Sequence, residues 1–318
     1  MNKRHLLSTK DITKNDVKLI FDNTIQIYNR LLKYKGKQLS LLCNQNIMMM
    51  FYENSTRTKV SFELAGKWMG ANVININSSK SSVSKGESLR DTVLTLSATG
   101  VDALIIRHPS SGVVQQVTEW INRESSNKPS IINAGDGTHE HPTQALIDVL
   151  TIFQSLGSIE NKRILIVGDI LHSRVARSNI FLLNTLGAEI VLVSPSNMLP
   201  SEVRKWPVLV SNKLDNEISK ADAIIMLRVQ SERINGMLFP SPREYALMYG
   251  LSKKRQEMLK SEAVILHPGP IIRDMEISSS VAYTPQSAIL QQVINGVYLR
   301  MALLCYLLLD TNLESIHL

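Results

Sequence analysis

From residue 46 to residue 60 the chain reads NIMMMFYENSTRTKV. The apolar run predicts a buried strand over 46–51, and the spacing of apolar residues predicts a helix from about Arg57 to Met69. Hydroxyl groups and cations therefore gather where a strand ends and a helix begins. A helix N-terminus offers unpaired N–H groups and partial positive charge, so this junction suits an anion. A plain Ser/Thr cap beside a solvated arginine explains the stretch alone equally well.

The same alternation of strand and helix recurs along the chain. Thr13 and Asp16 predict the start of a first helix, with Asp16 in the place of the Glu or Gln of a capping box. Further strands are predicted at residues 72–76, 102–107, 130–133, 163–167, 189–193, 222–227 and 263–266. Further helices are predicted at about residues 88–100, 113–121, 143–156, 174–186 and 286–309. Repeated βα units predict mostly parallel sheets.

The predicted fold class is therefore α/β, with two doubly wound parallel-sheet domains and a cleft between them. We expect a boundary in the helix near 143–157, because no low-complexity linker interrupts the pattern. The first domain would hold residues 1–145 together with a returning C-terminal helix at about 290–318. The second would hold residues 146–289. Open α/β sheets bind ligands beyond the carboxyl ends of their strands.

The 318 residues carry 35 Lys and Arg against 28 Asp and Glu, a net charge of +7. This charge suits nucleic acid or small acidic substrates. We favour small substrates, since the cations are scattered and aromatic residues, the usual base-stacking platforms, make up only 5% of the chain. The densest cluster, Lys253–Arg255, is expected on an exposed helix.

Several other classes of protein are disfavoured. Cys43 and Cys305, both in apolar runs, form no metal or disulfide pattern, and His139 and His141 lack the spacing of a helical zinc pair. No dinucleotide fingerprint, Walker loop or nucleophile elbow occurs, so neither a metal nor a cofactor is expected. The apolar runs are too short for a signal peptide or membrane span, and a cytoplasmic location is expected.

Cations, histidines and amides recur at the predicted strand ends. They occur in Ser81–Glu87, Arg107-His-Pro109, Asn133–Gln144, Gly168–Arg174, Arg228-Val-Gln230 and His267-Pro-Gly-Pro270. A solvated surface does not explain so many at one edge. The sequence predicts a site for small anions there.

These motifs together resemble the aspartate and ornithine carbamoyltransferase family over nearly the whole chain. Ser55-Thr-Arg-Thr58 is similar to the carbamoyl-phosphate signature that both branches share. His267-Pro-Gly-Pro270 resembles the aspartate branch, since the ornithine enzymes carry a cysteine in that motif. Two features depart from the pattern, namely Ile272 before Arg273 and the segment 194–212.

The resemblance implies that the amino group of L-aspartate attacks carbamoyl phosphate, an early step of pyrimidine synthesis. It also implies the site residues. Those expected to bind carbamoyl phosphate are Ser55, Thr56, Arg57, Thr58, Arg107, His141, Gln144, Gly269 and Pro270. Those expected to bind aspartate are Ser81, Lys85, Arg174, Arg228 and Gln230. The catalytic set is expected to be Arg57, Thr58, Lys85, Arg107 and His141, and the Gly269–Pro270 bond is expected to be cis.

The resemblance further implies a homotrimer, because the loop with Ser81 and Lys85 resembles one that reaches a neighbouring subunit's site. A regulatory or dihydroorotase chain is a possible further partner. Three alternatives stay open: a carbamoyltransferase for an ornithine-like amino acid, a non-catalytic anion-binding subunit, and a nucleic-acid binder. Arg174 and Arg228 favour a dicarboxylic acceptor, since two guanidiniums would repel the ammonium of ornithine.

Overall fold

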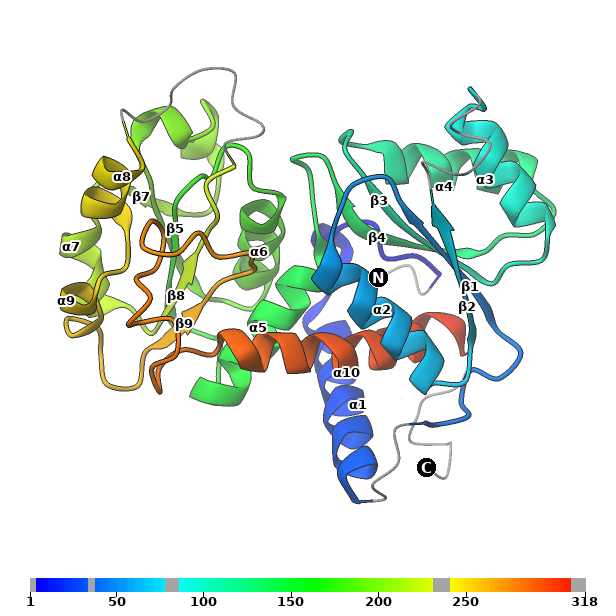
Figure 1. The fold of residues 1–318 in the computed structure, drawn as a ribbon, viewed down its shortest axis with the longest axis horizontal. Helices are drawn as coiled ribbons and strands as arrows, with labels where there is room; N and C mark the ends of the chain where they lie inside the picture. Colours follow the sequence, from blue (N-terminus) through cyan, green and yellow to red (C-terminus); the bar gives the residue numbers. More distant parts are fainter. Residues whose placement is uncertain (1–3, 34–37, 78–85, 231–240, 310–318) are drawn as a thin grey trace. The chain divides into compact units, whose positions relative to one another are not determined.

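The computed structural model describes residues 4–33, 38–77, 86–230 and 241–309. Contacts within the chain divide it into two compact units. The first unit holds Met1–Thr143 and Ile294–Leu318, and the second holds Gln144–Val293. The C-terminal helix α10 (Ile289–Leu308) therefore starts in the second unit and ends in the first, which confirms the predicted return (Figure 1).

The first unit is built on a parallel sheet. Its strands are β1 (Asn46–Phe51), β2 (Asn72–Asn77), β3 (Ala103–His108) and β4 (Ser130–Asp136), in the order β2-β1-β3-β4. Its helices, besides α10, are α1 (Lys14–Lys33), α2 (Thr56–Trp68), α3 (Leu89–Ala98) and α4 (Val113–Glu124).

Alternate residues of β1 cover the two faces of this sheet. Met48 and Met50 pack in one apolar cluster with residues of α3 and α4. Ile47 faces α2, where Gly66 allows close approach: a Cβ atom there would lie 2.5 Å from Val73 Cγ2. Helices thus cover both faces of the sheet, which explains the continuous apolar run in the sequence.

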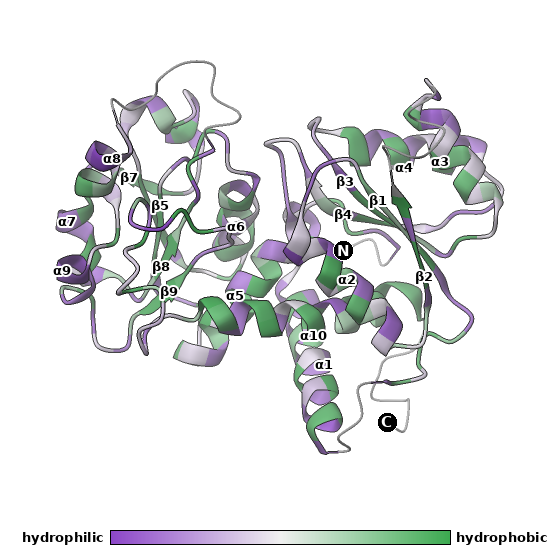
Figure 2. Cartoon of the chain, in the orientation of Figure 1, coloured by the Kyte–Doolittle hydropathy of each residue, from purple (hydrophilic) through white to green (hydrophobic). Residues whose placement is uncertain are grey.

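The second unit repeats this plan. Its parallel strands are β5 (Arg163–Val167), β6 (Glu189–Val193), β7 (Leu209–Ser211), β8 (Ala223–Met226) and β9 (Val264–Leu266), in the order β7-β6-β5-β8-β9. Its helices are α5 (Pro142–Leu156), which begins at the last residues of the first unit, α6 (Arg174–Thr185), α7 (Leu214–Glu217), α8 (Pro242–Tyr249) and α9 (Lys253–Gln256). The central strands and much of α10 consist of apolar residues, which are green in Figure 2. The predicted fold class of two parallel-sheet α/β domains is confirmed.

Three of the described strands and α-helices were absent from the sequence prediction, namely β7, α7 and α8. β7 is a three-residue edge strand whose residues are exposed or half-buried, so it carries no alternating apolar pattern. α8 had a readable signal, because the Ser241 side chain accepts a hydrogen bond from Glu244 N and Pro242 follows at the first helical position. The capping pair Thr13 and Asp16 is confirmed by reciprocal bonds of 2.9 and 3.2 Å.

Two expectations about single residues were wrong. Arg255 is not part of a solvated cluster, because it is buried and its Nε donates to Asp215 Oδ1 at 2.6 Å. Cys43 is exposed although two leucines precede it, whereas Cys305 is buried. Within the described residues, no helix is long and apolar enough to cross a membrane.

Candidate functional site

The loops that leave β1 and β3 start side by side. Phe51, the last residue of β1, pairs with Arg107 on β3, and β4 lies on the other side of β3. Parallel strands end at one edge of the sheet. The segment 55–58, Arg107 and His141 therefore all follow strands that end along this edge of the first unit.

Ser55 caps helix α2. Its backbone is extended, and its Oγ accepts a hydrogen bond from Thr58 N at 3.4 Å. Thr58 is buried, and its Oγ1 lies 3.4 Å from Nε2 of the buried His141. Thr56 and Arg57 occupy the exposed first turn of α2. The helix N-terminus and the histidine loop thus meet at the predicted anion position.

Arg107 is held in place by two acceptors. Its Nη1 donates to Ala134 O at 3.2 Å, and its Nη2 donates to Glu53 Oε1 at 3.2 Å. Only 10% of the Arg107 side chain is exposed, so the ion pair offsets the cost of burying the guanidinium. Glu53 lies in the opening stretch, but sequence reasoning gave it no role.

The loop before His141 is fixed by a buried carboxylate. Asp136 Oδ2 accepts from Gly112 N at 2.7 Å, and Oδ1 accepts from Glu140 N at 3.1 Å. Burial alone would raise the pKa of Asp136, but hydrogen bonds, first that of His139, outweigh it and lower this pKa. The same contact raises the pKa of His139. His139 therefore supports the loop through this contact.

The sheet of the second unit also has an edge at which its parallel strands end. Val167 of β5 pairs with Met226 of β8, and β9 lies beside β8. The loops that follow these strands carry the other predicted residues, in segments 168–174, 228–230 and 267–270.

Asp169 joins two of these loops. It is fully buried, and its oxygens accept from His172 N at 3.1 Å and from Gln230 N at 3.3 Å. Arg174 is the first residue of α6 and is buried, while Arg228 and Gln230 are half-buried. Gly168 has φ +123° and leaves no room for a side chain, since a Cβ atom would lie 2.9 Å from Tyr245 Oη.

The remaining predicted residues divide into three groups. The Gly269–Pro270 bond is cis, as predicted. Gln144 donates through Nε2 to Asp148 Oδ1 at 2.7 Å. Ser81 and Lys85 lie outside the described residues. Among the residues that the structure describes, no group of three or more His, Cys, Asp or Glu side chains could hold a metal ion.

Two parallel-sheet units with polar loops at the carboxyl ends of their strands are the architecture of a two-domain α/β enzyme. Two family models cover the chain: the carbamoyl-P binding domain of aspartate/ornithine carbamoyltransferases matches residues 4–154, and their Asp/Orn binding domain matches residues 160–307. The chain belongs to the aspartate/ornithine carbamoyltransferase family.

Individual relatives fall in the aspartate branch. The chain is 62% identical to the aspartate carbamoyltransferase catalytic subunit of Mycolicibacterium smegmatis, and the match covers 100% of both chains. Among solved structures, it resembles the catalytic subunit of the M. jannaschii aspartate transcarbamoylase, with TM-score 0.83, 35% identity and coverage of 97% and 99%. It also resembles the Trypanosoma cruzi enzyme in complex with N-(phosphonacetyl)-L-aspartic acid, with TM-score 0.85, 28% identity and coverage of 97% and 96%.

Proposed function

We propose that this chain is a catalytic chain that transfers the carbamoyl group of carbamoyl phosphate to the α-amino group of L-aspartate. The products are N-carbamoyl-L-aspartate and phosphate. The observation that carries the proposal is a family match across both halves of the chain, combined with the capped N-terminus of α2 beside His141.

Carbamoyl phosphate is assigned to the edge of the first unit. Ser55, Thr56, Arg57 and Thr58 hold the phosphate, because the first turn of α2 offers N–H groups, hydroxyls and a guanidinium. Arg107 contacts phosphate and the carbonyl oxygen.

His141 is assigned to the carbonyl oxygen and Gln144 to the carbamoyl amine. Since Nε2 of Gln144 already donates to Asp148, its Oε1 is the atom suited to accept from that amine. Gly269 and Pro270 contribute backbone carbonyl groups to the same substrate.

Aspartate is assigned to the loops of the second unit. Arg174 and Arg228 grip its two carboxylates, and Gln230 adds an amide. Ser81 and Lys85 complete the set from a neighbouring subunit, which requires a homotrimer with shared sites. A regulatory or dihydroorotase chain and the cytoplasmic location stay predictions.

The chemistry follows from these donors. The amine attacks the carbonyl carbon, a C–N bond forms, the C–O bond to phosphate breaks, and the departing phosphate accepts the amine proton. Negative charge develops on the carbonyl oxygen, where Arg107 and His141 stabilise it by roughly 3–4 kcal/mol for each donor. Holding the amine against the carbonyl contributes on the order of 7–11 kcal/mol.

An acceptor assay tests the proposal. Purified protein is given carbamoyl phosphate with aspartate or ornithine, and each carbamoylated product is measured. We expect turnover with aspartate alone. Turnover with ornithine alone would favour the other branch of the family, and tight binding of a bisubstrate phosphonate without turnover would indicate a silent subunit.

A further inference from the structure

Glu276 is a fully buried carboxylate of the second unit that the assigned site does not use. Its Oε1 accepts a hydrogen bond from Val229 N at 2.9 Å. Its Oε2 accepts from Ile272 N at 2.8 Å and lies 3.2 Å from His267 Nε2. A buried charge of this kind persists only when several donors satisfy it. Here the donors come from three separate segments of the chain.

Two of those segments carry residues assigned to the substrates. Val229 lies between Arg228 and Gln230, so its backbone N–H sets where both side chains start. The hydrogen bond from Val229 N to Glu276 therefore fixes the backbone between the two residues that we assign to aspartate.

His267 brings the second segment to the same carboxylate. Its Nδ1 accepts from Gly269 N at 2.8 Å, which places the ring proton on Nε2, and Nε2 therefore donates to Glu276. One carboxylate thus fixes both the loop after β8 and the loop after β9.

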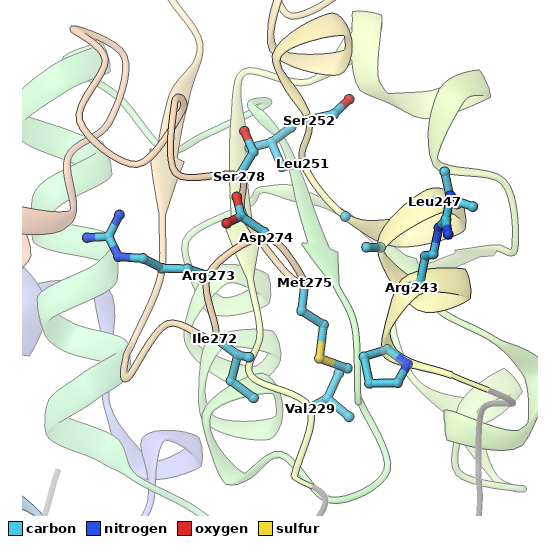
Figure 3. A pocket seen from close by; sticks show the side chains of 13 residues that line it. Val229, Arg243, Leu247, Leu251, Ser252, Ile272, Arg273, Asp274, Met275 and Ser278 are labelled. Atoms are coloured by element: carbon cyan, nitrogen blue, oxygen red, sulfur yellow. The ribbon is translucent and has the colours of Figure 1, made fainter.

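A pocket borders these loops. The side chains of Val229 and Ile272 line a pocket of about 690 Å³, which Met275 and Leu247 also border (Figure 3). Val229 also belongs to the buried apolar core of the second unit. Core packing of its side chain and the hydrogen bond from its backbone N to Glu276 therefore hold the loop after β8 together.

We propose that Glu276 is a positioning residue for the aspartate site. Without touching substrate, it holds the backbone of 228–230 and 267–270 in the arrangement that lets Arg228 and Gln230 meet the acceptor. Hydrogen bonds to an ionised group in a dry interior are strong and directional, which suits this task. The inference rests on the proposed assignment of Arg228 and Gln230 to aspartate.

The test compares Glu276→Gln with a matched control, Asp274→Asn. The glutamine keeps the size of the side chain but turns one acceptor into a donor that faces other donors. Asp274 is an acid of the same loop that accepts from Ser279 N at 2.8 Å, and none of its described bonds reaches an aspartate loop. Its φ of 62° is one that asparagine tolerates.

We expect Glu276→Gln to raise the KM for aspartate about tenfold or more. The dissociation constant for inorganic phosphate, assigned to the first unit, should change by less than about twofold. Asp274→Asn should leave both quantities unchanged. A merely structural role would lower the folded fraction but would not separate the two ligands.

Glu276→Asp keeps the charge and provides a second variant if the glutamine form does not fold; its KM for aspartate should also rise while phosphate affinity holds. A folded Glu276 variant with an unchanged KM for aspartate overturns the inference, as does an equal loss for both ligands. The Arg228→Ala variant distinguishes a failure of the Glu276 inference from a failure of the aspartate-site assignment. If Arg228→Ala leaves the KM unchanged, the aspartate assignment itself is wrong.

Discussion

Arg57 is the exposed cation of the first turn of α2, next to the buried Thr58 and its neighbour His141. Its place in the first turn of a helix puts a guanidinium beside backbone N–H groups that have no acceptor within the helix. The side chain is exposed, so its removal costs little stability, while a donor that we assign to the leaving phosphate is lost.

The first prediction concerns Arg57→Ala. We expect the variant to stay folded and to lose about 10²–10³-fold in kcat. Lys59→Ala is the control, since Lys59 is a cation of the same helix without an assigned role. Circular dichroism and steady-state kinetics check both variants. Turnover close to that of the parent protein would remove Arg57 from the mechanism.

His5 gives a second prediction, for the dependence of stability on pH. Its Nδ1 accepts from Ile131 N at 3.1 Å, and burial, helped by Arg4, lowers its pKa from 6.5 to about 4. The folded chain therefore holds the neutral ring. The contribution of His5 to stability is complete above 6.5 and is lost as the pH falls from there towards 4.

His5→Asn tests this link, because the asparagine oxygen replaces Nδ1 as an acceptor and does not titrate. Urea unfolding is measured at about pH 7.5 and about pH 5. We expect the parent protein to lose more of its free energy of unfolding between these values than the variant. Equal losses would show that another group causes the acid sensitivity.

The sequence predicted which polar side chains follow the strands. It did not show which contacts hold those side chains in place. Arg107 and His141 stand in short polar motifs after apolar runs, so their position along the chain is enough to single them out. Asp169 and Glu276 act through partners 61 and 47 residues away. Only the folded sheet brings those partners together, and a lone acid in a loop carries no sign of it.

At the scale of elements, regular βα spacing made most strands and helices predictable, whereas short or exposed pieces such as β7 were not. Contacts between helices could not be predicted from the sequence either. Arg300 of α10 is buried, and its Nη1 donates to Ser61 Oγ of α2 at 2.7 Å. Its Nη2 donates to Thr143 Oγ1 of α5 at 3.1 Å. The hydroxyl of Ser61 in turn donates to Arg57 O at 2.7 Å.

The third prediction follows for Arg300→Met, which keeps much of the side-chain length and removes every donor. The hydroxyls of Ser61 and Thr143 would lose a buried donor, so we expect the free energy of unfolding to fall by about 3 kcal/mol. Carbamoyl phosphate should also bind more weakly, since α2 and the first turn of α5 would no longer be tied together by Arg300.

Arg123→Met is the control for this change, because Arg123 is exposed on α4. Its effect should stay within about 0.5 kcal/mol. Urea unfolding and calorimetric titration with carbamoyl phosphate measure the two quantities. A stable Arg300→Met protein with parental affinity would show that α10 does not hold these turns.

At the scale of the whole molecule, the chain leaves the first unit after Thr143 and returns to it at Ile294. The described residues from Ile294 to Leu309 complete a unit whose other part ends at Thr143. The returning helix buries a set of apolar side chains, namely Leu299, Met301, Leu303, Leu304 and Cys305. Tyr306 Oη also donates to Asp16 Oδ1 at 2.6 Å, which ties the end of α10 to the start of α1.

The fourth prediction is that a chain ending at Val293 keeps the second unit folded and loses the first. Each large buried side chain removed costs about 2–5 kcal/mol, and several of them together exceed the roughly 5–15 kcal/mol by which a domain is usually stable. Hydrogen exchange read by mass spectrometry should show rapid exchange over β1–β4 and continued protection over β5 and β8. A chain ending at Leu309, which retains all of these contacts, should exchange like the parent. Parental protection of β1–β4 in the shorter chain would mean that the first unit folds without its C-terminal segment, and that the helix serves some purpose other than completing this core.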